Sequence, residues 1–251
     1  MTKNFDLTLT PKQGEAFLLL TSPEDIELMY GGGKGGGKTV GGCKWVFYYA
    51  KWLIQFFDLK PSDVPPVVGF IGRKQAVDFS TTTLNTFKRD IPAEAYEIKE
   101  QKKLIVFENT IAVQFGGLDD GETIQKFNSA EYAFVWIDQP DECTQHDIGM
   151  LRATLRLKIN GKQPPYKMLL TPNPVISDDP ELQWLREQFI DNPTAKRKFI
   201  PALYRDNPHL PENYGQVMDD AYGFNPDLLA AYKDGDWSQV GSADVVIPRS
   251  L

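Results

Sequence analysis

Cysteine, histidine and long apolar runs are all scarce in this sequence. The 251 residues include two cysteines and two histidines, and no Cys/His cluster has the spacing of a metal site. Two thiols do not make a disulfide framework, so a reducing cytoplasm is the expected compartment. No run of about 18 apolar residues could span a membrane, and residues 1–6 lack the apolar core of a secretory signal. These absences exclude the disulfide-rich secreted class and the membrane-spanning class.

Positive charge is scarce as well. The chain has 27 Lys and Arg against 34 Asp and Glu, which gives a formal net charge of -7 at pH 7. Such an acidic chain does not favour broad, nonspecific binding of nucleic acid. We therefore expect any contact with DNA to be local, or to come from a partner or from a segment outside this sequence.

Strand-length apolar runs alternate with segments of helical pattern along the chain, which predicts an α/β fold with a mostly parallel sheet flanked by helices. The hydrophobic share of 41% is enough for a packed core. Strands are predicted at residues 26–30, 67–71, 133–137, 166–170 and 198–203, with a hairpin at 104–115. Helices are predicted at residues 11–20, 38–57, 74–89, 148–157, 181–189, 211–221 and 226–232.

A glycine-rich run between the first predicted strand and the second predicted helix carries the strongest motif. Residues 32–39 match G-x-x-x-x-G-K-[ST] in full. Glycines let backbone amides approach phosphates closely, and the start of the next helix adds positive potential. The alternative, a merely flexible turn, does not explain the Lys-Thr pair. The residues expected to bind ATP here are Gly32, Gly33, Lys34, Gly35, Gly36, Gly37, Lys38 and Thr39.

Magnesium is the expected cofactor of this nucleotide site. Lys38 would reach the β- and γ-phosphates, and Thr39 would ligate Mg²⁺. The apolar strand at 133–137 ends in Asp138, and an aspartate at the carboxyl end of a parallel strand lies near the ligand crevice of an open sheet. We expect Asp138 to be the second metal-holding residue, against the alternative of a surface aspartate that starts a turn.

The residue after Asp138 is Gln139. ATPases of the additional-strand catalytic-glutamate type carry a glutamate at this position. A carboxylate there deprotonates the attacking water, whereas an amide can only hydrogen-bond to it. We therefore expect catalysis at position 139 to be impaired while ATP binding is kept. A deliberate Glu-to-Gln change is the favoured explanation. A natural variant that uses Glu142, and a glutamine that positions water alone as in some GTPases, remain open.

Polar residues after the strand at 166–170 form a second candidate contact with the nucleotide. The run from Leu169 to Pro174 contains Thr171 and Asn173. From the neighbouring strand, these two side chains could reach the γ-phosphate or its attacking water and sense whether that phosphate is present. Pro and Asn are also ordinary turn residues, so the motif depends on its position beside Asp138.

Taken in order, these motifs resemble the ATPase, or motor, domain of the large terminase subunit of tailed bacteriophages. That family carries a basic residue before the last glycines of the loop, as Lys34 does here, and it is implicated in catalysis as a charge on the γ-phosphate. The run from Leu9 to Gln13 resembles the family's adenine-recognition motif, with Gln13 as the reader. Residues 169–174 resemble its coupling motif, and residues 204–210 and 235–237 the segment that closes its ATPase domain.

The resemblance implies a RecA-like ATPase that drives DNA translocation into a procapsid. It implies double-stranded DNA, the portal protein and the small terminase subunit as partners, in a homo-oligomeric ring that is monomeric when isolated. The expected location is the host cell cytoplasm. Residues 1–203 would be the ATPase core, and residues 204–251 a lid or linker leading to a nuclease domain that this sequence does not contain.

In ring motors an arginine of one subunit completes the neighbour's site and stabilises charge in the transition state. Arg152 and Arg156 fall on the predicted helix 148–157. Arg156 is the preferred catalytic candidate by its spacing, while the ordinary alternative is a solvated helix face.

Two other functions share these motifs. A helicase-like DNA-dependent ATPase would have the loop and Asp138, but it should also carry a second RecA-like domain or a late arginine-rich motif, which we do not find in the sequence. A nucleotide-binding module without hydrolysis is favoured by Gln139 alone. The activity of a Gln139→Glu variant separates it from a disabled motor.

Overall fold

A computed structural model describes residues 8–119, 127–177 and 179–238 of the chain. Within these residues, one eight-stranded sheet has the order β3-β4-β5-β2-β6-β7-β1-β8. Its strands are β1 Ile26–Gly31, β2 Val67–Arg73, β3 Glu97–Lys99, β4 Leu104–Phe107, β5 Ile111–Gly117, β6 Phe134–Asp138, β7 Lys167–Thr171 and β8 Arg197–Pro201.

The sheet is mostly parallel, as the sequence predicts. The strands from β5 through β2, β6, β7 and β1 to β8 pair in parallel, while β4 pairs antiparallel with both β3 and β5. The hairpin of β4 and β5 confirms the prediction for residues 104–115. Because β7 lies between β1 and β6, an additional strand separates the glycine loop after β1 from Asp138 at the end of β6.

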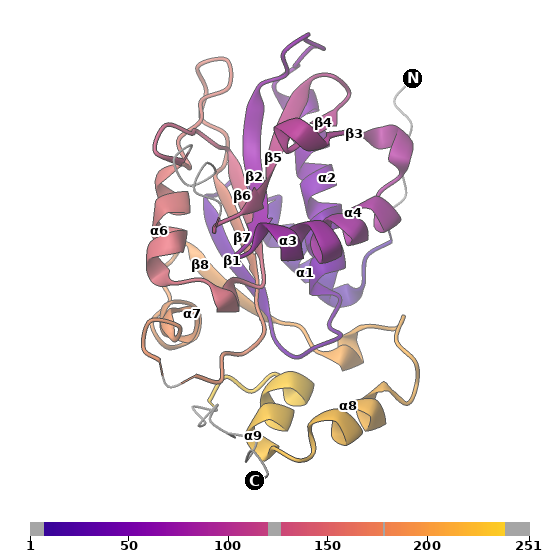
Figure 1. Cartoon of the computed structure of the whole chain (residues 1–251). Helices are drawn as coiled ribbons and strands as arrows, with labels where there is room; N and C mark the ends of the chain where they lie inside the picture. Colours follow the sequence, from indigo (N-terminus) through magenta and orange to yellow (C-terminus); the bar gives the residue numbers. More distant parts are fainter. Residues whose placement is uncertain (1–7, 120–126, 178, 239–251) are drawn as a thin grey trace.

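Helices cover both faces of the sheet (Figure 1). One face carries α1 Pro11–Leu20, α2 Lys38–Phe56, and a helix in three parts: α3 Ala76–Asp78, the π turn η1 Phe79–Thr83 and α4 Leu84–Asp90. The other face carries α6 Gln145–Ala153 and α7 Trp184–Arg186, which continues into the π turn η5 Glu187–Asp191. The described helices are all too short or too polar to cross a bilayer.

Short 3₁₀ turns and the last two helices complete the described elements. The 3₁₀ turns are η2 Ala93–Ala95, η3 Glu100–Lys102, η4 Pro140–Glu142 and η6 Tyr204–Asp206. The last helices are α8 Tyr214–Tyr222 and α9 Pro226–Leu229, with the π turn η7 Ala230–Asp234.

Local sequence explains where α1 begins. The Thr10 hydroxyl accepts a hydrogen bond from the Gln13 amide, the Gln13 side chain accepts one from the Thr10 amide, and Pro11 occupies the first turn. Such a capping box satisfies two amides that the helix itself cannot pair. The predicted cap and proline are confirmed, and they bring Gln13 beside the glycine loop.

Strand β6 links the core to the carboxyl edge of the sheet. Phe134 and Trp136 pack into the core under α2, whereas Val135 and Ile137 face the core under α6. The Trp136 indole lies so close to α2 that a Cβ on Gly42 would come within 2.2 Å of it. The Trp136 Nε1 group donates a hydrogen bond to the Thr171 hydroxyl at 3.0 Å. The packing of α2 and the orientation of Thr171 therefore depend on the same side chain.

The predicted helix 148–157 is wrong at both ends. It begins at Gln145, because Thr144 and Asp147 form a capping box that is visible in the sequence as T-x-x-D. It ends at Ala153, because the backbone turns there and Leu155 forms an isolated β-bridge with Tyr132, just before β6. Pairing with the sheet overrides the helical pattern there.

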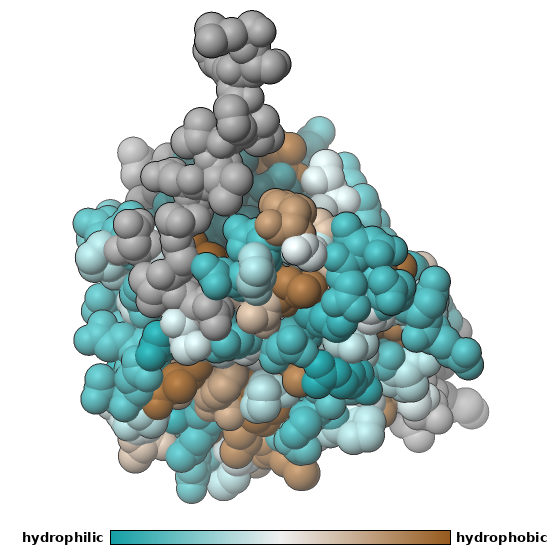
Figure 2. Space-filling view, turned by 90° about the horizontal axis from the view of Figure 1, so that it is seen from below, coloured by the Kyte–Doolittle hydropathy of each residue, from teal (hydrophilic) through white to brown (hydrophobic). Residues whose placement is uncertain are grey.

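Residues 204–238, the C-terminal segment, lie against the glycine loop below the sheet (Figure 1). The Lys34 amide donates to the Tyr232 carbonyl at 2.7 Å, and the Asn207 side chain donates to the Gly35 carbonyl at 2.8 Å. From the side of α8 and α9, the visible surface is largely hydrophilic with interspersed hydrophobic groups (Figure 2). The ends of the two predicted domains, residues 1–7 and 239–251, lie outside the described residues, and the boundary at 203 stays a prediction.

Replacing Gly33 with alanine should loosen the contact between the loop and the C-terminal segment. A Cβ on Gly33 would lie 2.6 Å from the Tyr232 carbonyl oxygen, which is backbone and cannot move freely. Overpacking of this kind costs about 1–3 kcal/mol, so the free energy of unfolding, measured in urea by tryptophan fluorescence, should fall by that amount. Gly149→Ala is the matched control.

Gly149 lies in α6, and no atom is within 4 Å of its Cβ position. Alanine should therefore stabilise the protein there by up to about 1 kcal/mol. Equal unfolding free energies for the two variants would contradict the close packing at Gly33.

Candidate functional site

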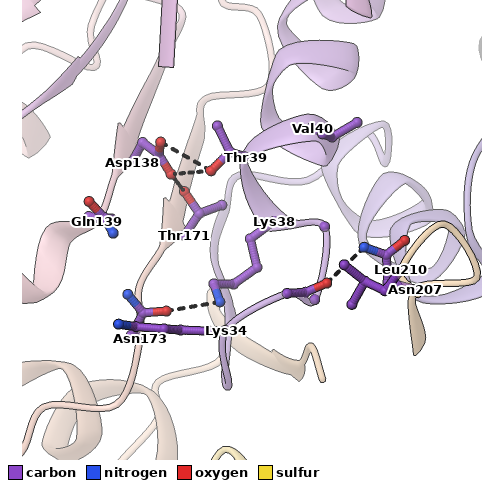
Figure 3. Close-up of a pocket in the computed structure, with 13 residues that line it drawn as sticks. Lys34, Lys38, Thr39, Val40, Asp138, Gln139, Thr171, Asn173, Asn207 and Leu210 are labelled. Carbon is purple, nitrogen blue, oxygen red and sulfur yellow. Dashed lines mark hydrogen bonds between the residues drawn. The ribbon is translucent and has the colours of Figure 1, made fainter. Parts of the chain in front are cut away.

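A pocket of about 330 Å³ opens at the carboxyl edge of the sheet (Figure 3). The glycine loop, the start of α2, the ends of β6 and β7, and the C-terminal segment all contribute to it. Its lining residues are Lys34, Gly35, Gly36, Gly37, Lys38, Thr39, Val40, Asp138, Gln139, Thr171, Asn173, Asn207 and Leu210. Most of the residues predicted from separate motifs therefore meet in one place.

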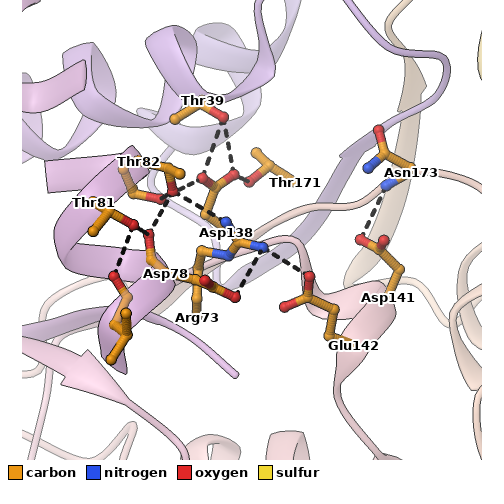
Figure 4. A network of polar contacts seen from close by, with 12 residues as sticks. Thr39, Arg73, Asp78, Thr81, Thr82, Asp138, Asp141, Glu142, Thr171 and Asn173 are labelled. Carbon is orange, nitrogen blue, oxygen red and sulfur yellow. Dashed lines mark hydrogen bonds and ion pairs between the residues drawn. The ribbon is translucent and has the colours of Figure 1, made fainter. Parts of the chain in front are cut away.

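Asp138 is the polar centre of the pocket (Figure 4). Its buried carboxylate accepts hydrogen bonds from the hydroxyls of Thr39 at 3.1 and 3.2 Å, Thr171 at 2.8 Å and Thr83 at 2.7 Å. These neutral donors hold the carboxylate in place without adding a competing cation.

The pair of Thr39 and Asp138 fits a magnesium ion. Mg²⁺ in nucleotide sites takes one or two protein oxygens and completes its shell with phosphates and water. The Thr39 hydroxyl faces the Asp138 carboxylate directly, which is the donor set expected. No group of three or more His, Cys, Asp or Glu side chains that could hold a metal ion occurs in residues 8–119, 127–177 and 179–238.

Lys38 is buried beneath the loop. Its ammonium donates to the carbonyls of Gly32 at 3.0 Å and Gly33 at 2.6 Å, and to Asn173 Oδ1 at 3.1 Å. Burial lowers the pKa of Lys38 to about 8, although Asp141 and Asp138 oppose the shift. The ammonium is held ready at the pocket by groups that anionic phosphates can replace, and Asn173 ties it to the end of β7.

Gln139 occupies a strained position at the pocket. Its φ of 53° and ψ of 55° lie in the left-handed region, which costs a residue other than glycine free energy and is often found at functional sites. Glu142, the alternative base, instead accepts a hydrogen bond from Arg73 at 2.7 Å and does not line the pocket. Asp141 accepts a hydrogen bond from the Asn173 amide at 3.1 Å, and burial raises its pKa to about 6.

Lys34 lines the pocket but points toward the C-terminal segment. Its Nζ atom donates to the Tyr222 hydroxyl at 2.7 Å and lies 4.1 Å from the centre of the Tyr232 ring and 4.9 Å from that of Tyr222. Aromatic faces attract cations, so the two tyrosines hold this ammonium. A contact of Lys34 with a γ-phosphate requires it to leave them.

Gln13 lies beside the loop without lining the pocket. Its Nε2 atom donates to the Gly37 carbonyl at 2.9 Å, and its Oε1 atom accepts from the Thr10 amide at 3.0 Å. The donor and the acceptor of the Gln13 side chain are thus both hydrogen-bonded within the protein. These two bonds connect α1 to the start of α2. Adenine reading by Gln13 stays a prediction.

The two arginines considered for a neighbouring site differ in their surroundings. Arg152 in α6 is paired with Glu27 at 3.0 Å and donates to Gln188, so it is committed within the chain. Arg156 follows the end of α6 instead of lying on it, and its half-exposed side chain lies 3.5 Å from Glu131. Arg156 is near the start of β6, at the edge of the sheet opposite Asp138, and cannot serve its own pocket.

Sequence reasoning missed four contributors to the site. Thr83 donates to Asp138 from the helix after β2, Val40 lines the pocket from α2, and Asn207 and Leu210 line it from the C-terminal segment. None of them belongs to a motif of the glycine loop or the strand ends. Only Thr83 of the TTT run at 81–83 is buried, and neither this run nor the Asn-Pro of residues 207–208 is distinctive enough to have identified them.

Comparisons with known proteins agree with this arrangement. The family model described as phage terminase large subunit matches residues 91–236, while a search of curated proteins gives no match. Among solved structures, the large terminase of the thermophilic bacteriophage D6E superposes with a TM-score of 0.70 at 14% identity, covering 92% of this chain and 54% of that one. The same terminase in complex with ATP-gamma-S gives 0.67 at 15% identity, covering 92% and 53%.

The large terminase of bacteriophage HK97 is also similar, with a TM-score of 0.61 at 10% identity over 92% of this chain and 51% of that one. The chain thus spans about half the length of the solved terminases it matches. At these identities the likeness shows the fold alone, a mostly parallel sheet flanked by helices that this chain shares with these terminases. The family model covers more than half of the sequence, and the chain therefore belongs to the phage terminase large subunit family.

Proposed function

We propose that this chain binds ATP with Mg²⁺ and serves as the motor domain of a DNA-packaging terminase. The observation that carries the proposal is the convergence of Lys38, Thr39 and Asp138 on one pocket below the glycine loop. The D6E terminase, a relative in fold, has been solved with ADP and with ATP-gamma-S. In this chain the loop amides and Lys38 would bind the phosphates, and Thr39 and Asp138 would hold the metal.

Charge and hydrogen bonding give each residue a task in this scheme. When bound beside Thr39 and Asp138, the metal would supply charge stabilisation for the transferred phosphoryl group. Lys38 positions the β- and γ-phosphates, and Lys34, once released by its two tyrosines, adds a second positive charge. Gln139 hydrogen-bonds to the attacking water but cannot accept its proton, so we expect the hydrolysis step to be slow in this chain.

Loss of the γ-phosphate would be sensed at the end of β7. The side chain of Asn173 accepts a hydrogen bond from Lys38, and its backbone amide donates one to Asp141. The Thr171 hydroxyl donates to Asp138. A change in phosphate contacts at Lys38 would therefore reach β7 and the C-terminal segment beside it. The assembled motor would be a ring on the portal, together with the small subunit, and in it that movement would push double-stranded DNA. Arg156 is the candidate arginine that would complete the site of a neighbouring subunit.

Thermal unfolding with and without ATP and Mg²⁺ tests the binding step. A ligand at about 100 times its Kd stabilises the folded state by about 2.7 kcal/mol, which corresponds to a rise in Tm of about 5–10 °C for a chain of this size. An unchanged Tm at millimolar ATP and Mg²⁺ would contradict the proposal. Lys38→Met should remove most of the shift.

A second candidate is a nucleotide-binding module that does not hydrolyse ATP. Gln139 in the pocket favours it, because no carboxylate occupies the catalytic position. It predicts the same thermal shift, but no gain of hydrolysis when glutamate is placed at position 139.

A further inference from the structure

Thr83 lies outside the motifs that define the nucleotide site, yet it makes the shortest hydrogen bond to Asp138. Its side chain is fully buried, and its hydroxyl donates to Asp138 Oδ2 at 2.7 Å. A buried hydroxyl that bonds to an ionised carboxylate makes a charge-assisted contact, stronger than a bond between neutral groups. This contact comes from an element that the phosphate-binding motifs do not include.

A π turn brings Thr83 to the site. The helix after β2 widens at η1, Phe79–Thr83, before α4 resumes. Such single wide turns are rare and are frequent at functional sites. Phe79 anchors the turn by stacking on Phe115, with ring centres 5.6 Å apart, and Thr82 accepts a hydrogen bond from Arg73 at 3.0 Å. The part of the turn that precedes Thr83 is thus fixed by two contacts.

The three hydroxyls on Asp138 divide its two oxygens between them. Thr171 bonds to Oδ1 at 2.8 Å, Thr83 bonds to Oδ2 at 2.7 Å, and Thr39 lies at similar distances from both. If Thr39 turns to ligate a metal, Thr171 and Thr83 still hold one oxygen each. The carboxylate plane is then fixed by two residues from different elements.

We propose that Thr83 is a positioning residue for the magnesium site, which orients the Asp138 carboxylate toward the metal bound with ATP. The inference rests on the proposed function, since it requires Mg²⁺-dependent binding of nucleotide. Groups that orient a metal ligand by hydrogen bonds typically contribute about 10–100-fold to metal affinity. The metal's contribution to nucleotide affinity should therefore depend on the Thr83 hydroxyl.

The test measures the Kd of the fluorescent analogue mant-ATP in EDTA and in excess Mg²⁺. The quantity compared between variants is the ratio of the Kd in EDTA to the Kd in Mg²⁺, which reports how much the metal strengthens binding. Thr83→Val keeps the shape but removes the hydroxyl, and Thr83→Ala removes it without adding atoms. Both should lower the ratio by about tenfold and leave the Kd in EDTA within about twofold of wild type. Thr83→Ser restores a hydroxyl and should restore the ratio.

Thr81→Val is the matched control on the same turn. The Thr81 hydroxyl is exposed and bonds to the Val77 carbonyl, away from Asp138, so its loss should not change the ratio. A wild-type ratio in both hydroxyl-free variants would overturn the inference, and so would an equal loss of affinity in EDTA and in Mg²⁺. Wild-type protein that binds no mant-ATP in either buffer would contradict the proposed function itself.

Discussion

Placing a glutamate at position 139 should raise the rate of ATP hydrolysis by about 10²–10⁴-fold, the usual contribution of a general base. Gln139 already lines the pocket in the left-handed backbone conformation, and glutamate has nearly the same shape. The substitution therefore changes the proton acceptor while leaving the backbone strain unchanged. Steady-state release of phosphate from ATP in the presence of double-stranded DNA measures the effect.

Glu142 provides the control for this experiment. Because Glu142 is held by Arg73 and lies outside the pocket, Glu142→Gln in the Gln139→Glu background should lower the rate by less than about tenfold, far less than the loss of a general base. If the wild-type chain hydrolyses ATP as fast as the Gln139→Glu variant, our account of Gln139 is wrong. If that wild-type activity then disappears in Glu142→Gln, Glu142 is the base instead.

Lys38→Met should weaken the binding of ATP and Mg²⁺ by about 100-fold. The loss corresponds to a charge-assisted hydrogen bond to phosphate, which contributes about 1.5–3 kcal/mol. The same change should alter the free energy of unfolding of the nucleotide-free protein by less than about 1 kcal/mol, because two effects oppose each other. Methionine removes the cost of burying a charge whose pKa is lowered to about 8, but it leaves the carbonyls of Gly32 and Gly33 without their donor.

Isothermal titration calorimetry with ATP-gamma-S measures the affinity, and urea unfolding measures the stability. Lys44→Met is the matched control, since Lys44 lies on the same helix but bonds to the Thr8 carbonyl at the surface. Unchanged affinity in Lys38→Met would mean that the glycine loop does not bind phosphate. A loss of stability as large as the loss of affinity would mean that Lys38 acts chiefly in folding.

The sequence predicts the central part of the site because each signal there is local. The glycine loop follows a strand and precedes a helix, and Asp138 ends an apolar strand, so chain order alone places them at one edge of a parallel sheet. The position of β7 between them could not be read from spacing. It follows from pairing with β1 and β6, which is a tertiary property.

The residues that the sequence did not reveal reach the site through long-range packing. Thr83 depends on a π turn, and the extra residue in that turn shifts the phase of the helix, so a regular period of 3.6 does not place Thr83 toward Asp138. The tyrosines that hold Lys34 come from the C-terminal segment, nearly two hundred residues later in the chain. The pattern from Leu151 to Leu157 predicts a helix that includes Arg156, whereas the β-bridge between Leu155 and Tyr132 ends that helix early.

A crystal structure grown with excess ATP-gamma-S and Mg²⁺ tests the central claim most directly. The account predicts the triphosphate in the pocket between residues 34–39 and Asp138, with the Lys38 ammonium on the β- and γ-phosphates and the metal beside Thr39 and Asp138. A pocket left vacant under these conditions, or a nucleotide bound elsewhere on the chain, would contradict it.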